Sequence, residues 1–154
     1  MIDGNTERLS AKQLGKERGL DLKLAYLFLR LTLGVNICFH GVSRLLAGPA
    51  VFASSLLPEF QKTLLPSWSV YGFGLTLPWT EAILGFLLLI GLGTRWALIG
   101  GSLLILVLTF GSTLHQDWNA AGAQLVYAAI YAALLAFRER NAWSVDSVIE
   151  SRQG

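Results

Sequence analysis

A single glutamate, Glu81, lies deep within a long apolar stretch of the 154-residue sequence. A carboxylate in a hydrocarbon environment is strongly unfavourable unless it is paired or neutralised. Arg44, His40 and Arg30 are its plausible cationic partners, because each also lies within an apolar stretch. The sequence leaves two interpretations open. Glu81 is either an acid that binds or protonates a small ligand, or one half of a Glu–Arg pair that ties two helices together.

The polar residues around His40 share one helical face. Asn36, His40 and Arg44 are spaced four apart, so each is rotated by only about 40° from the one before. Arg30 and Gly34 fall in the same broad sector. A helix with one polar stripe and apolar residues elsewhere is typical of a membrane helix that turns its polar side toward a bundle interior.

Counting along the helices places further polar residues near the depth of Glu81. At about 1.5 Å per residue, Asn36, Glu81, Thr109 and Gln124 each lie about 20 Å from a basic residue at the cytoplasmic end of their helix. His40 lies at about 26 Å and His115 at about 30 Å. His115 has a second interpretation, as a residue solvated at the interface beside Asp117 and Trp118. We therefore predict one site with catalytic candidates Glu81, His40 and Arg44 and with substrate- or quinone-binding candidates Arg30, Asn36, Thr109, His115 and Gln124.

The composition requires a membrane to hold such a site. Hydrophobic residues make up 53% of the chain and charged residues 14%, against about 25% charged in soluble domains. Four apolar segments are long enough to cross a hydrocarbon layer of about 30 Å as helices. We predict an all-α, integral membrane four-helix bundle with spans over about 22–46, 70–92, 96–114 and 120–137.

The remaining segments are predicted as tails and a loop. Residues 1–21 read as a mobile tail or a short helix on the membrane surface, and 138–154 as a C-terminal tail. The loop 47–69 carries an amphipathic run, 52–65, which we expect to lie in the interface plane.

The distribution of basic residues predicts the orientation. Nine lysines and arginines lie in the two tails and at Arg95, whereas only Arg44 and Lys62 lie on the other side. This bias predicts that both termini are cytoplasmic and that the loop 47–69 faces outward. We expect a multi-pass protein of the cell's inner (plasma) membrane, surrounded by the lipid bilayer and without a nucleic-acid partner.

Cysteine usage narrows the chemistry. Cys38 is the only cysteine, which excludes an intramolecular disulfide, a two-cysteine redox pair and c-type haem attachment. No Cys/His spacing fits a structural zinc site. We expect no metal and no haem, and a quinone as the electron acceptor if the chain takes part in redox chemistry.

Two stretches resemble the DoxX/DoxD superfamily. Residues 30–44 contain RLTLG and FHGVSR, as in the first span of that family, and residues 77–95 contain LPWTE and GFLLLIGLGTR, as in its second span and turn. The stretch LTFGS at 108–112, with Trp118, Tyr127 and the closing WSVD at 143–146, is most similar to the branch of the thiosulfate:quinone oxidoreductase small subunit. The resemblance covers residues 24–146.

This resemblance implies a four-helix membrane protein that is often part of a larger redox complex. It gives our first hypothesis, a membrane subunit of a quinone-linked oxidoreductase acting on thiosulfate or another reduced sulfur compound. It carries over Arg30, His40, Arg44, Pro78, Glu81 and Arg95 as a candidate set. The family enzyme has a second subunit that this chain does not contain, so we expect a second protein subunit or a homo-oligomer.

Two other hypotheses stay open. The charged tails and the lack of a complete catalytic constellation fit a non-enzymatic scaffold or assembly subunit that recruits a redox partner protein. A transporter is the third, and four spans without inverted repeats argue against one that acts as a monomer.

Overall fold

The protein is a bundle of helices, as the hydropathy pattern predicts. The computed structural model describes the backbone of residues 4–152 and the side chains of residues 12–152. Four of its helices are long and apolar enough to cross a membrane. Their ends lie within three residues of the predicted spans, apart from the start of the first. The elements are α1 (Gly4–Ala47), α2 (Pro49–Phe60), α3 (Ser67–Ile90), α4 (Thr94–Leu114), α5 (Trp118–Ala136), the 3₁₀ turn η1 (Arg138–Arg140) and α6 (Val145–Ser151).

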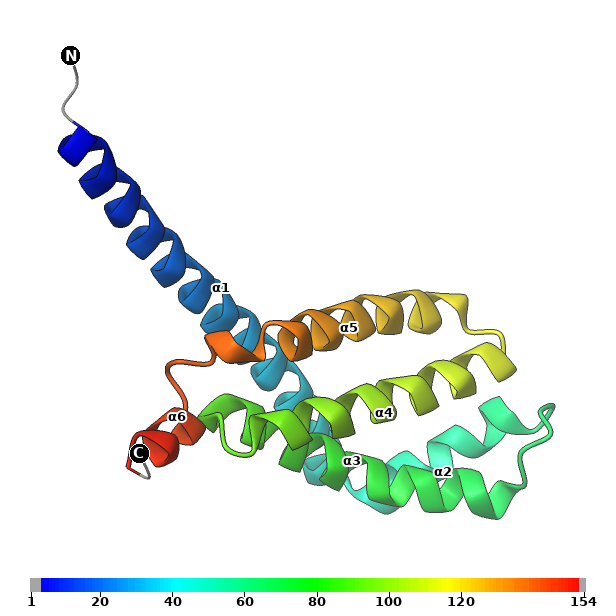
Figure 1. The fold of residues 1–154 in the computed structure, drawn as a ribbon. Coiled ribbons are helices and arrows are strands. Elements are labelled where there is room, and N and C mark those ends of the chain that lie inside the picture. The colour runs from blue at the N-terminus through cyan, green and yellow to red at the C-terminus, as the bar shows by residue number, and fades with distance from the viewer. Residues whose placement is uncertain (1–3, 153–154) are drawn as a thin grey trace.

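Helix α1 is far longer than a membrane span requires. Its 44 residues extend about 66 Å, more than twice the thickness of a hydrocarbon core. Figure 1 shows its N-terminal half projecting beyond the other helices. The segment 1–21 is therefore neither a free tail nor a separate surface helix from Gly4 onward, and residues 1–3 lie outside the described part. Good helix formers such as Lys12, Leu14 and Glu17 let the helix propagate outward from the span.

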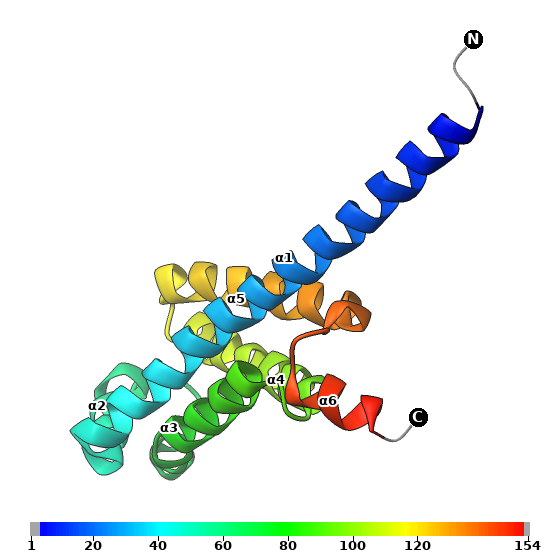
Figure 2. The same ribbon diagram turned by 90° about the vertical axis from the view of Figure 1, so that its left-hand side faces the viewer.

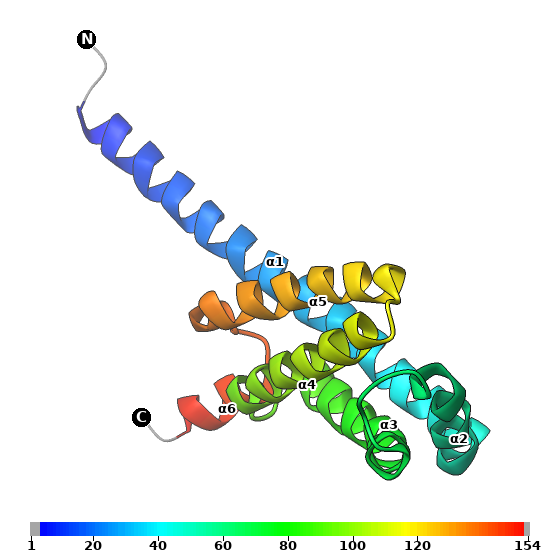
Figure 3. The same ribbon diagram turned by 90° about the vertical axis from the view of Figure 1, so that its right-hand side faces the viewer.

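The helices pack as a chain of neighbours. Helix α1 lies against α3, α3 contacts α4, and α4 packs along α5. Helix α1 crosses the others diagonally, which Figures 2 and 3 show from two sides. Because of this crossing, α1 and α5 touch over only a short length.

Glycines allow the contact between α1 and α3. A methyl group on Gly41 would overlap the backbone of Pro78 and Ala82, and one on Gly85 would overlap the backbone of Cys38. The two helices thus meet backbone to backbone at two places. Small residues commonly permit such close approach between membrane helices.

The position of α2 differs from the prediction for the loop 47–69. The run 52–65 was expected to lie flat at the interface, but α2 lies alongside α3 instead (Figure 1). The buried Ala53 sits directly against Gly74, where a side chain larger than hydrogen would not fit. This close fit gives α2 a place on α3.

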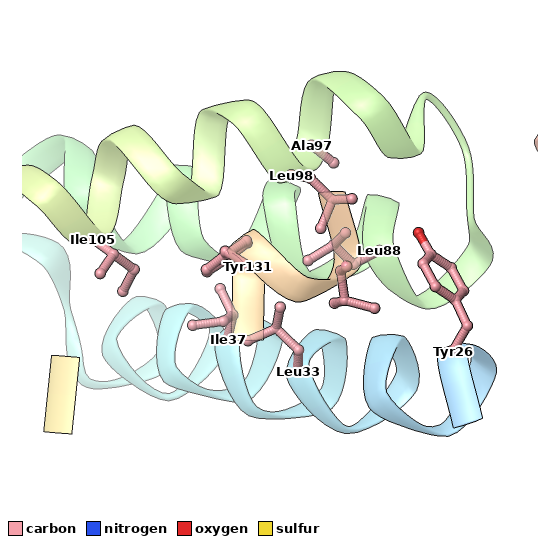
Figure 4. Close-up of a cluster of buried hydrophobic side chains, with 9 residues drawn as sticks. Tyr26, Leu33, Ile37, Leu88, Ala97, Leu98, Ile105 and Tyr131 are labelled. Carbon is pink, nitrogen blue, oxygen red and sulfur yellow. The ribbon is translucent and has the colours of Figure 1, made fainter. Parts of the chain in front are cut away.

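The core lies where α1, α3, α4 and α5 meet. Its buried members are shown in Figure 4: Tyr26, Leu33, Ile37, Leu88, Ala97, Leu98, Ile105, Tyr131 and Leu134. The fully buried ring of Tyr131 on α5 lies against Gly101 on α4. An aromatic ring fills the space that a glycine leaves, so the bundle is closed at this depth.

The C-terminal segment is ordered against the bundle, unlike the tail predicted over 138–154. The Asp146 carboxylate accepts hydrogen bonds from the backbone N–H groups of Gly93 (2.7 Å) and Thr94 (2.8 Å). It therefore caps the start of α4, whose first N–H groups would otherwise lack partners. Figure 1 shows α6 at the turn between α3 and α4. Residues 153–154 lie outside the described part.

The glycine contact between α1 and α3 can be tested with a matched pair of substitutions. Gly85→Ala should destabilise the protein by about 1–3 kcal/mol, because the added methyl overlaps Cys38 and overpacking costs that much in a tight interface. Gly72→Ala on the same helix is the control, since no atom lies within 4 Å of its added methyl. Thermal unfolding in detergent would measure both variants. Equal melting temperatures would contradict the proposed contact.

Candidate functional site

Glu81 and Arg44 form an ion pair inside the bundle. Both carboxylate oxygens of Glu81 accept hydrogen bonds from the Arg44 guanidinium. The Glu81 side chain is 5% exposed and that of Arg44 is 28% exposed. Of the three cationic partners considered from the sequence, the structure thus brings Arg44 to Glu81. The carboxylate is buried and paired, as a charge in a membrane protein must be.

The surrounding helices fix the position of Arg44. The Gly41 contact brings α1 close to α3 one turn before Arg44, next to Pro78 and Ala82. The guanidinium carbon lies 4.6 Å from the centre of the Phe52 ring on α2, which is a cation–π arrangement. Arg44 is therefore held between a carboxylate and an aromatic ring.

Arg44 also lines a cavity with a volume of about 430 Å³. The cavity lies among α2, α3, the end of α4 and the start of α5. Most of its lining is apolar, including the rings of Phe52, Phe60, Phe73 and Phe110. Its polar lining residues are Arg44, Glu59, Ser69, Ser112, His115 and Asp117. Ligand sites in proteins commonly combine such an apolar wall with a few polar groups.

His115 contributes the imidazole of this cavity. It ends α4 as the C-cap residue, and its ring centre lies 4.7 Å from that of Phe60, tilted by 60°. The next turn is fixed by Asp117, whose side chain accepts from the backbone N–H of Ala120 (3.0 Å) and so caps α5. The ring is half-buried, so His115 is a cavity residue as well as a residue near the helix end.

Gln124 lies behind the same wall. Its amide nitrogen donates to the hydroxyl of Ser112 (2.9 Å), a buried residue that lines the cavity. The Gln124 amide oxygen is buried without a hydrogen-bond partner among the described residues. A buried acceptor left free is unfavourable by about 1–3 kcal/mol, so this wall has an unused acceptor.

Among the described residues, Asn36, Thr109 and His40 make no hydrogen bond to the Arg44–Glu81 pair. The Asn36 side chain accepts from the Tyr127 hydroxyl (2.8 Å). The Thr109 hydroxyl donates to the carbonyl of Ile105 in its own helix (2.8 Å). His40 is exposed and is not among the residues that line the cavity. The polar residues predicted at one depth thus form separate contacts, because equal depth does not fix the side of the helix from which a residue projects.

Arg30 lies at the opposite end of the α1–α3 contact. It is 1% exposed and donates to the carbonyls of Leu88 and Leu89 at the end of α3 and to the carbonyl of Trp143 (2.8 Å). The carbonyls of Leu88 and Leu89 are among those that a helix terminus leaves without partners. The partial negative charge of a helix C-terminus also favours a cation there. The structure gives Arg30 a structural position and not a place in the cavity.

Sequence reasoning missed several residues of the site. Phe52 and Phe60 were assigned to a loop, and Ser112 was not considered as a partner of Gln124. The spacing of Phe52, Leu56 and Phe60, four residues apart, is a helical signal that could have identified this wall. Tyr127 was noted only within the family resemblance, although a tyrosine in a span usually finds a hydrogen-bond partner.

Comparison with known proteins identifies a family. The profile of the family described as DoxX matches residues 25–116, which include Arg44, Glu81 and His115. No curated protein and no solved structure matches the chain significantly. Within the described residues, no group of three or more His, Cys, Asp or Glu side chains could hold a metal ion.

The Arg44–Glu81 pair can be tested by a double-mutant cycle. Arg44→Met should destabilise the protein by about 3–5 kcal/mol, because it leaves a buried carboxylate unpaired. Glu81→Met should have a smaller effect, since the partly exposed guanidinium can still be hydrated. The double variant should be more stable than the sum of the two changes predicts, because no charge stays unpaired. Additive changes in the free energy of unfolding would show that the pair is not coupled.

Proposed function

From the premise that this chain belongs to the DoxX family, whose profile covers residues 25–116, we propose that it is a membrane subunit of a quinone-linked oxidoreductase. The proposed quinone site is the cavity beside Arg44 and His115. The observation that carries this proposal is an apolar, aromatic-lined cavity of about 430 Å³ with Arg44 and His115 in its wall, alongside the carboxylates of Glu59 and Asp117.

The residues of the cavity fit a quinone head group. A quinone ring is flat and apolar and has two carbonyl oxygens that accept hydrogen bonds. The phenylalanine rings offer flat surfaces, and the Arg44 guanidinium and the His115 ring offer donors. The volume lies within the range of about 300–1,000 Å³ typical of small-molecule sites. The shape and the donor set therefore agree with this class of ligand.

His115, Arg44 and Glu81 each have a distinct role in the proposal. A bound quinone would supply a two-electron acceptor that also takes up protons. His115 would hold a proton at the cavity wall and donate it to the bound head group. Arg44 would orient a carbonyl oxygen or an anionic substrate. Glu81 does not line the cavity but holds Arg44 in place, which makes it a positioning residue.

The finer parts of the proposal follow from the resemblance and from charge. The proposed electron donor is thiosulfate or another reduced sulfur compound, delivered with the help of a second subunit. The bias of basic residues supports cytoplasmic termini, and we propose an inner membrane. In that orientation the cavity would lie at the outer end of the bundle. A small anion could then approach Arg44 from outside.

Substituting His115 tests the quinone site. His115→Phe keeps the ring packing against Phe60 but removes the imidazole, so affinity for a short-chain benzoquinone should fall about tenfold, the equivalent of one lost hydrogen bond of about 1.4 kcal/mol. Trp79→Phe, an exposed aromatic change on α3, should leave affinity unchanged. Calorimetric titration of the purified protein and thiosulfate-dependent quinone reduction in membranes would measure this. Unchanged affinity in the His115 variant, or no binding by the wild type, would contradict the proposal.

A second candidate function rests on the projecting half of α1. Its described side chains are almost all exposed, and they include Lys12, Lys16, Arg18 and Lys23. A helical arm that carries basic residues beyond the bundle suits the recruitment of an acidic partner protein. On this reading the chain is a scaffold for a redox partner and carries out no catalysis of its own.

The arm gives a separate prediction. Changing Lys12, Lys16 and Arg18 together to glutamate should abolish co-purification of a stoichiometric partner, because the attraction becomes repulsion. Lys62→Glu, an exposed change outside the arm, is the control. Partner retention by the triple variant in low-salt buffer would rule out the arm as the docking element.

A further inference from the structure

The groove between α1 and α5 is the second cavity of the described chain, and it is unlike the first. Its volume is about 380 Å³, and it is lined by Leu29, Thr32, Leu33 and Asn36 of α1 and by Ala123, Val126, Tyr127 and Ile130 of α5. It exists because α1 crosses α5 diagonally and touches it over a short length (Figure 3). The groove contains no charged residue.

Two polar side chains of α1 have unused hydrogen-bonding groups: Asn36 lines the groove, and His40 lies one helical turn beyond it. The Asn36 amide accepts from Tyr127, but among the described side chains its nitrogen donates to nothing, and the exposed His40 ring one turn later has no partner. Asn36 lies 11 positions before the end of α1, about 16 Å inside it. At that depth acyl chains offer no acceptor, so the two donors of the amide nitrogen remain unsatisfied.

Several hydroxyl groups of the other spans do not have this problem. The hydroxyls of Thr76 and Thr80 on α3 donate to carbonyls of their own helix, and those of Ser102 and Thr109 on α4 do the same. Among the described residues, neither the amide nitrogen of Asn36 nor the ring of His40 makes such a bond to its own helix. Asn36 therefore calls for a polar group from outside the chain.

The chemistry of this face fits a second copy of the same chain. An amide and an imidazole each offer both a donor and an acceptor, so two identical faces related by a two-fold axis can satisfy each other. The absence of charge between Arg30 and Arg44 on α1 removes repulsion between the copies. Ala123 on α5 lines the groove, and Ser43 lies about two turns beyond Asn36 on α1. Both are small residues, which permit close approach. Two-fold dimers are also the commonest oligomers.

We propose that the protein forms a two-fold dimer in the membrane through the α1–α5 face, defined by Asn36, Phe39, His40, Ser43 and Tyr127. Asn36 of each copy donates to the amide or imidazole of the other. This interface lies apart from the quinone-site cavity, so the proposal does not depend on the function proposed above.

Cysteine cross-linking in membranes tests the interface. In the full chain carrying Cys38→Ala, Phe39→Cys places a thiol at a residue that is 68% exposed, and Leu106→Cys places one at a residue of α4 that is 65% exposed. Mild oxidation should convert Phe39→Cys to a covalent dimer at least tenfold more than Leu106→Cys. Equal cross-linking, or an adduct with the mass of another protein, would overturn the proposal.

The polar contact is tested by comparing two variants that lose the same internal hydrogen bond. Asn36→Leu combined with His40→Leu should weaken dimerisation about tenfold in light scattering of nanodisc or detergent samples. Tyr127→Phe also removes the Asn36–Tyr127 bond but keeps both polar groups, so it should dimerise like the wild type. His115→Phe should also remain dimeric, which separates this interface from the cavity. A wild-type monomer, or an unchanged dimer in the double variant, would overturn the proposal.

Discussion

The close contact between α1 and α3 positions both arginines of the first span. Gly41 and Gly85 let the two backbones meet, and the arginines lie on either side of this contact. Arg30 and Arg44 are 14 residues apart, about 21 Å along the helix. At one end α3 offers the free carbonyls of its C-terminus, and at the other it offers the carboxylate of Glu81. One helix pair therefore compensates two charges that lipid could not accept.

Arg30 and Arg44 share a helical face but differ in exposure, because α3 offers them different partners. The carbonyls around Arg30 are backbone groups that every helix end provides, so the residue there needs only to donate. Glu81 is a charged side chain in the middle of the chain's second span, and it holds Arg44 at a cavity wall. The first arrangement fixes the bundle and leaves Arg30 fully buried. The second leaves part of the guanidinium accessible.

The sequence determines the helices well and the site only in part. Hydropathy predicts the spans because a membrane requires long apolar helices, and electrostatics predicts that Glu81 needs a cation. It does not predict that Gln124 turns to Ser112 or that Asn36 turns to Tyr127, since these depend on the rotation of each helix about its axis. Arg30 binds backbone carbonyls 58 and 59 residues away, which carry no side-chain signature. Asp146 lies in a polar segment that composition alone marks as a tail.

The position of the cavity follows from how the core is filled. The ring of Tyr131 occupies the space beside Gly101, so the bundle is closed where α1, α3, α4 and α5 meet. Beyond that level α2 lies along α3 and takes part in the wall, with the end of α4 and the start of α5 completing it. A ligand therefore reaches Arg44 and His115 without passing through the core. Glu81 does not line the cavity but is paired with Arg44. A charged ligand in the cavity would therefore contact the guanidinium and not the carboxylate.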